Sequence, residues 1–184
     1  VLKEKKEITP PPAYPAELVP FRGHQAPTVL YNAMINPMVP YAVRGAIWYQ
    51  GEANRGDGKI YREKMKALIE GWRSVFNNND LAFYFVQIAP YNYRSSPQAL
   101  PIIWEAQVEV AQTVPNTGIA IINDIGKLKN IHPTNKQDVG KRLAMLALNK
   151  TYGKKDIVCD SPLFKEMKIE GNAIKVTFSN AKTL

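Results

Sequence analysis

Cysteine and histidine, the residues that most often mark metal and redox sites, are nearly absent from this sequence. Its 184 residues include one cysteine and two histidines. Cys159 has no partner for a disulfide within the chain, so a buried core must hold the fold. No histidines lie at a metal-binding spacing such as His-x-x-x-His, and no phosphate-binding loop of the Walker type is present. The sequence therefore predicts neither a metal site nor a nucleotide site.

Long apolar runs and dense basic runs are also lacking. No stretch approaches the ~18 apolar residues that a membrane span needs, so no membrane partner is expected. The charged N-terminus, VLKEKKE, has no apolar core, so we expect no signal peptide in this sequence. The net charge is +8, but the lysines are scattered and not interleaved with aromatic residues. We therefore expect solvated helix faces and no nucleic-acid partner.

Two kinds of segment alternate along most of the chain. Short, nearly all-apolar runs predict strands, and apolar residues spaced by three or four predict helices. Strands are expected at residues 46–49, 81–89 and 118–123, and helices at 59–76, 102–114 and 135–152. This alternation predicts an α/β fold with a parallel sheet covered on both faces. Alternating residues around Gly171 and Asn172 predict a β-hairpin near the C-terminus.

The chain divides into three parts by composition. Residues 1–28 hold six of the fourteen prolines and are interpreted as a linker or a wrapping arm. Residues 29–155 contain the strand–helix alternation and are expected to form the α/β domain. Residues 156–184 are interpreted as the start of a β-rich region.

Polar residues follow each expected strand, where parallel α/β sheets bind their ligands. Gln50, Gly51, Glu52 and Asn54 follow the first strand. Glycine allows close backbone approach, and the Asn54 amide can donate to the oxyanion of a tetrahedral intermediate. Glu52 is expected to accept hydrogen bonds from loop N–H groups. The alternative is an ordinary turn, since Gly, Asn and Asp dominate turns.

Two further candidates follow the third strand. His132 is expected to lie on a loop just before a helix. Pro133 follows it and restricts the loop, and Thr134 is expected to cap the helix. This place suits a general base, although a loop histidine bonded only for shape fits as well. Asp124 could orient His132 or simply turn the chain.

No nucleophile is evident. None of the serines lies in a Gly-x-Ser-x-Gly or Gly-Asp-Ser context. Those in the strand-following loop, Ser95 and Ser96, are interpreted as turn residues.

Three stretches resemble successive blocks of the sialate O-acetylesterase family, in the SGNH hydrolase superfamily. They are LYNAMINP at 30–37, GAIWYQGEAN at 45–54, and DIG at 124–126 continuing to IHPTNKQDVGKRL at 131–143. The resemblance implies a three-layer α/β/α, flavodoxin-like parallel sheet, here incomplete, with a C-terminal β-hairpin from a following β region. Residues 29–155 then correspond to a partial SGNH hydrolase domain.

The resemblance also implies roles for the candidate residues. His132 matches the family's catalytic histidine, and Gln50, Gly51, Glu52 and Asn54 match the block near the oxyanion hole. Residues 104–107, WEAQ, resemble a helix segment that faces the site. Where many SGNH enzymes have an aspartate three residues before the histidine, this sequence has Lys129. Either Asp124 orients the ring, or a backbone carbonyl does so in a Ser–His dyad.

The family's serine lies in an upstream Gly-Gln-Ser-Asn segment, which this sequence lacks. The resemblance thus implies removal of O-acetyl groups from sialic acids by serine–histidine acyl transfer, without a cofactor, with the serine missing from this chain. The implied partner is an acetylated sugar, and the implied location is periplasmic or secreted. A polysaccharide acetylesterase of the acetylxylan type and a non-catalytic carbohydrate-binding or interaction module are the alternatives. Missing upstream strands would expose an apolar sheet edge, which invites self-association.

Overall fold

The computed structural model describes residues 26, 28–94 and 96–181. Apart from residues 26 and 28, the predicted N-terminal arm lies outside this description. The chain divides into two compact units between Ala42 and Val43. In the first unit a short π-helix, η2 (Tyr31–Ile35), runs directly into a 3₁₀ helix, η3 (Asn36–Met38).

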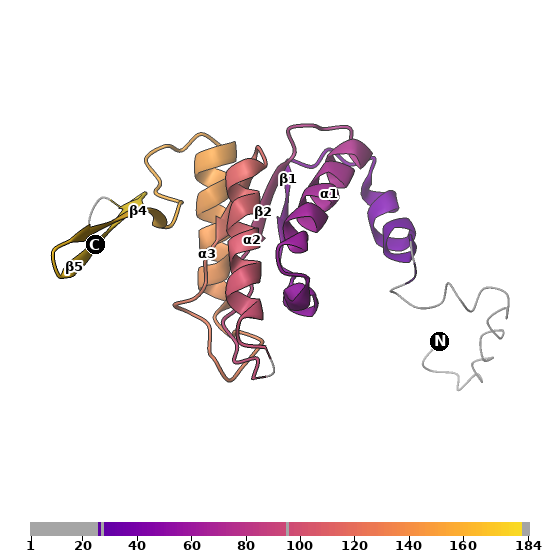
Figure 1. Ribbon diagram of the computed structural model, residues 1–184. Helices are drawn as coiled ribbons and strands as arrows, with labels where there is room; N and C mark the ends of the chain where they lie inside the picture. Colours follow the sequence, from indigo (N-terminus) through magenta and orange to yellow (C-terminus); the bar gives the residue numbers. More distant parts are fainter. Residues whose placement is uncertain (1–25, 27, 95, 182–184) are drawn as a thin grey trace, which may run out of the picture. The chain divides into compact units, whose positions relative to one another are not determined.

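The second unit contains the predicted parallel sheet (Figure 1). Its strands pair in the order β1-β2-β3, with Trp48 opposite Phe85 and Val86 opposite Ala120. The three helices follow the strands in alternation, as the sequence predicts. The elements are β1 (Gly45–Trp48), α1 (Ile60–Val75), β2 (Ala82–Val86), α2 (Ala99–Thr113), β3 (Thr117–Ala120) and α3 (Lys136–Leu146).

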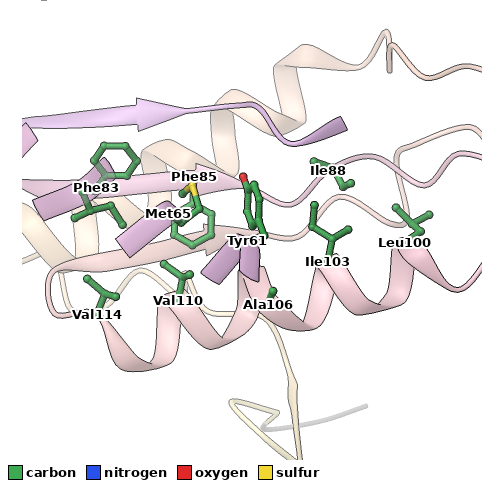
Figure 2. Packing of buried hydrophobic residues seen from close by; sticks show 11 residues of the cluster. Tyr61, Met65, Phe83, Phe85, Ile88, Leu100, Ile103, Ala106, Val110 and Val114 are labelled. Atoms are coloured by element: carbon green, nitrogen blue, oxygen red, sulfur yellow. The ribbon is translucent and has the colours of Figure 1, made fainter. Parts of the chain in front are cut away.

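The central strand β2 is buried on both faces and carries the core. Phe83 and Phe85 pack with residues of α1 and α2, including Met65 and Val110 (Figure 2). Tyr84 and Val86, and with them Ala82, point the other way and pack with α3 through Val139, Leu143 and Leu146. Helices therefore cover both faces of the sheet, which confirms the predicted three layers.

Several boundaries differ from the prediction. Helix α2 begins at Ala99, before Pro101, because a proline in the first helical turn forfeits no intrahelical hydrogen bond. Helix α3 ends at Leu146 and continues as a π-helical turn, η5 (Ala147–Thr151). Neither difference changes the order of the layers.

The C-terminal hairpin forms as predicted, with longer strands. Strands β4 (Leu163–Glu170) and β5 (Ala173–Ser179) pair antiparallel. Gly171 has φ +62° at the turn, a conformation that glycine adopts without strain. Across the described residues, no helix combines the length and apolar character required to cross a bilayer.

Candidate functional site

The segments that follow the three parallel strands contact one another. The Arg55 guanidinium lies 4.7 Å from the centre of the Tyr93 ring, which joins the segment after β1 to that after β2. The backbone N–H of Asn92 donates to the Leu128 carbonyl at 2.9 Å, which joins the segments after β2 and β3. These contacts place the polar residues of all three segments at the carboxyl edge of the sheet.

Two further contacts bring the third segment close to the others. A Cβ at Gly126 would lie 2.4 Å from Cδ of Pro90, so only glycine allows this approach. Just beyond His132, the Lys136 ammonium lies 4.5 Å from the centre of the Tyr49 ring. Tyr49 immediately precedes Gln50, so this contact links the start of the Gln50–Asn54 block to the helix that begins after His132.

Helix α2 holds the backbone of β2 where that strand leaves the sheet. The Gln107 side chain accepts a hydrogen bond from Ile88 N at 3.1 Å and donates one to Val86 O at 3.4 Å. Trp104 Nε1 donates to Ile88 O at 2.8 Å. Because the ladder ends here, these side chains complete bonds that a neighbouring strand would otherwise make. The WEAQ segment thus contacts the edge of the sheet at which the site lies.

Gly51 is a glycine for reasons of both conformation and space. Its φ is +149°, and a Cβ there would lie 2.6 Å from the Cγ2 atom of Ile88. The preceding carbonyl, Gln50 O, accepts a hydrogen bond from the Tyr61 hydroxyl at 3.1 Å. The loop after β1 therefore packs closely against α1 and the segment that follows β2. Any residue other than glycine at position 51 would disturb this packing.

Asn54 lies in the 3₁₀ helix η4 (Glu52–Asp57), at the centre of a hydrogen-bond chain. Its Oδ1 accepts from Gln50 Nε2 at 2.6 Å, and its Nδ2 donates to Asp57 Oδ2 at 2.7 Å. Lys64 Nζ lies 2.7 Å from the same Asp57 oxygen. Hydrogen bonds from Lys64 and Asn54 hold the pKa of Asp57 below its ordinary value. The Gln50–Asn54 segment, for which an ordinary turn was the alternative, thus leads into a short 3₁₀ helix in which hydrogen bonds order the Asn54 side-chain amide.

Glu52 does not hold loop N–H groups as expected. Among the described residues its carboxylate accepts no hydrogen bond, and its charge instead lies near three tyrosines. Burial raises the pKa of Tyr49 and Tyr61 to about 12, and Glu52 adds to both shifts. The pKa of Tyr93 is raised by the same two causes. These phenols therefore stay protonated at neutral pH and can act as hydrogen-bond donors.

His132 is exposed on the loop after β3, and the next residue, Pro133, is buried. The His132 N–H donates to Asn130 Oδ1 at 2.9 Å, which orders the backbone at this residue. The helix cap lies one residue later than predicted: Asn135, not Thr134, accepts from Asp138 N at 3.1 Å. Asn135 Nδ2 also donates to the Asp138 carboxylate at 2.6 Å, which holds the capping side chain in place.

The Asp124 carboxylate forms an ion pair with Arg142 of α3. Its two carboxylate oxygens accept from Arg142 Nη1 at 2.7 Å and Nη2 at 2.5 Å. These hydrogen bonds hold the pKa of Asp124 below its ordinary value. No hydrogen bond joins Asp124 and His132 in the described part of the chain. The role of Asp124 as orienting acid stays a prediction, and the arrangement favours the dyad alternative.

Some buried polar side-chain atoms at or shortly after the ends of β1 and β2 lack a hydrogen-bond partner, and no sequence pattern identified them. Four such side-chain atoms occur among the described residues: Trp48 Nε1, Tyr49 OH, Gln87 Oε1 and Tyr93 OH. Gln87 is 3% exposed and directly follows β2. An unpaired buried polar group is costly, so native proteins usually keep few of them, often at functional sites. The described residues contain no group of three His, Cys, Asp or Glu side chains arranged to hold a metal ion.

Comparison with known proteins identifies the family. Residues 21–149 match the carbohydrate esterase family described as sialic acid-specific acetylesterases. The chain belongs to this family. It is 32% identical over 168 residues to the sialate O-acetylesterase of Rattus norvegicus, covering 82% of this chain and 31% of that protein. The human sialate O-acetylesterase is 30% identical over 165 residues, covering 80% of this chain and 32% of the human protein.

A solved structure supports the same assignment. A carbohydrate acetylesterase from Xanthomonas citri superposes with a TM-score of 0.76 at 39% identity, covering 84% of this chain and 37% of that one. The chain therefore spans about a third of the length of the acetylesterases that it matches. Its parallel sheet and helix layers are those expected of the family.

Gln87 and Gln107, the buried glutamines in the part of the chain that the structure describes, should respond differently to substitution. Gln107→Met leaves Ile88 N and Val86 O unpaired, so we expect the free energy of unfolding to fall by about 1–3 kcal/mol. Gln87→Met, of similar shape, removes an oxygen that already lacks a partner, so stability should stay within about 0.5 kcal/mol or rise. Urea denaturation of both variants measures the difference. An equal loss in the two variants would show that Gln87 Oε1 is bonded in solution.

Proposed function

We propose that this chain supplies the base and oxyanion side of a carbohydrate O-acetylesterase that removes acetyl groups from sialic acids. The attacking serine is not among the serines of this sequence and comes from another part of the protein. The proposal is carried by one observation: the Gln50–Asn54 block and the segment from His132 to Lys136 are joined through the contact between Lys136 and Tyr49. The proposal includes the convergence of the His132 ring and the Asn54 amide on one pocket.

In the proposed reaction each group has one task. The serine attacks the acetyl carbonyl while His132 takes its proton and later delivers it to the sugar oxygen. Asn54 Nδ2 and backbone N–H groups of the same loop, with Gly51 allowing close approach, donate to the oxyanion. Gln50 orders Asn54 through a hydrogen bond, and the charge of Glu52 adds to the raised pKa of Tyr49. The ring of His132 is oriented by a backbone carbonyl, or by Asp124 if Arg142 releases that carboxylate.

The acetylated sugar is proposed from the family and its relatives. Sialic acids carry a carboxylate, which the net charge of +8 favours. An acetylxylan-type substrate fits the same chemistry and is separated only by comparing rates. A non-catalytic carbohydrate-binding module would bind sugar without needing His132. Activity on acetylated sugars outside the cytoplasm, in the periplasm or after secretion, is part of the proposal and is tested by cell fractionation.

Replacement of His132 tests the reaction directly. In a form of the protein extended upstream of Val1, we expect His132→Ala to lower kcat by about 10⁴-fold or more, because the serine loses its base. Asn54→Ala should lower kcat by about 10²–10³-fold through loss of one oxyanion donor. The assay compares acetylated sialic acid, acetylated xylan and p-nitrophenyl acetate.

The other histidine provides the matched control, since His24→Ala should leave kcat unchanged. The 184-residue chain alone should show little or no turnover. Robust hydrolysis by this chain that disappears with His132→Ala would overturn the claim of a missing serine. Full activity of His132→Ala in the extended form would remove the proposed base.

We also propose that the outer edge of β1 mediates self-association of the 184-residue chain. Within the described residues β1 pairs only with β2, and Ile47 on β1 is 70% exposed. A lysine on an edge strand opposes strand-to-strand pairing, so Ile47→Lys should abolish any concentration-dependent rise in molecular mass. Ile60→Lys is the control, since Ile60 on α1 is 63% exposed. Light scattering across concentrations decides: equal effects of both lysines, or a parent monomeric throughout, would contradict the proposal.

A further inference from the structure

Asn54 can stabilise an oxyanion only if its amide nitrogen, and not its carbonyl oxygen, faces the substrate oxygen that becomes negatively charged. The two ends of a carboxamide have nearly the same shape, so packing alone selects poorly between them. Rotation by a half turn would replace a donor with an acceptor and repel the oxyanion. Some neighbour with fixed hydrogen-bonding character must therefore select the productive orientation.

Gln50 cannot make this selection by itself. Its Nε2 donates to Asn54 Oδ1 at 2.6 Å in this structure. The Gln50 side chain is also a carboxamide, however, and could turn to accept a hydrogen bond from a reversed Asn54. The Gln50 contact is therefore compatible with both orientations of Asn54.

Asp57 can make the selection, because an ionised carboxylate only accepts hydrogen bonds. Its Oδ2 lies 2.7 Å from Asn54 Nδ2. The contact follows from local structure: both residues lie in the 3₁₀ helix η4, where side chains three residues apart align on one face. A reversed Asn54 would set its Oδ1 against the carboxylate, oxygen to oxygen. That arrangement is repulsive, so it is excluded while Asp57 is charged.

Lys64 completes the arrangement from α1. Its ammonium lies 2.7 Å from the same Asp57 oxygen that Asn54 contacts. It favours the charged carboxylate and offsets a negative charge that would otherwise oppose an oxyanion forming beside Asn54. Of the two hydrogens on Asn54 Nδ2, Asp57 takes one. The other is left to donate to the reaction centre.

We propose that Asp57, assisted by Lys64, is a positioning residue that fixes the Asn54 amide with its nitrogen toward the oxyanion. The inference rests on the proposed esterase function and adds to it the residue through which Asn54 is oriented. Asp57 itself need not touch the substrate. Its effect should appear in kcat and should depend entirely on Asn54.

The test uses Asp57→Asn, which keeps the shape but can present a donor to a reversed Asn54. In the upstream-extended protein we expect kcat to fall by about tenfold with KM nearly unchanged, less than the 10²–10³-fold loss for removing the amide. Asp80→Asn is the matched control, because Asp80 also accepts from an asparagine amide, Asn116 Nδ2, at 3.2 Å. That variant should leave kcat unchanged.

A double-mutant cycle separates positioning from general damage. In the Asn54→Ala background, Asp57→Asn should cause no further loss of kcat, because the group it orients is gone. Independent, multiplying losses would overturn the inference, as would an Asp57→Asn variant that matches the Asp80→Asn control. An inactive parent would instead refute the proposed function, and this inference with it. Lys64→Arg should retain most of the activity, whereas Lys64→Met should lower kcat in the presence of Asn54 only.

Discussion

The parallel direction of β1, β2 and β3 is the constraint on which the whole site depends. Parallel strands send every following segment out at the same edge of the sheet, so residues far apart in sequence meet there. Three side-chain and backbone contacts then lock the segments together: Arg55 on Tyr93, Asn92 on Leu128, and Lys136 on Tyr49. Without the parallel sheet, the segment that carries Asn54 and the loop that carries His132 would not leave the sheet at the same edge.

The hydrogen bonds at this edge fall into a satisfied and an unsatisfied set. Gln107 and Trp104 complete the backbone bonds of β2 as it leaves the sheet. Nearby, Tyr49, Gln87 and Tyr93 keep buried polar atoms without partners in the described part of the chain. A rigid scaffold of paired groups that holds unpaired groups at one edge is the arrangement expected where a polar ligand binds.

The periodic parts of the fold were predictable from the sequence, whereas the polar contacts were not. All-apolar runs identified the strands because β2 is buried on both faces, and apolar spacing identified α1 and α3. Helix α2 starts at Ala99, earlier than the predicted start at Ile102, since Pro101 lies in the first turn, where a proline is tolerated. The N-cap of α3 is Asn135 and not the predicted Thr134, because both residue types can cap a helix and the sequence does not distinguish them.

The site residues show the same division. Asn54 and His132 were found from strand-end position and family resemblance, since both are polar residues at the edge where ligands bind. The pairing of Asp124 with Arg142 joins residues far apart in the chain, and no spacing rule reveals it. Asp57 lay within a turn-like Arg-Gly-Asp-Gly stretch, and its alignment with Asn54 follows only once the 3₁₀ helix is known.

The most direct test of the account is a crystal structure of the upstream-extended protein after reaction with a phosphonate ester, which traps serine hydrolases as a tetrahedral adduct. The account predicts the phosphonyl oxygen at about 3 Å from Asn54 Nδ2. It also predicts the His132 ring within hydrogen-bond reach of the serine oxygen. An adduct whose oxygen is bound elsewhere, with Asn54 and His132 on separate sides of the sheet, would contradict it.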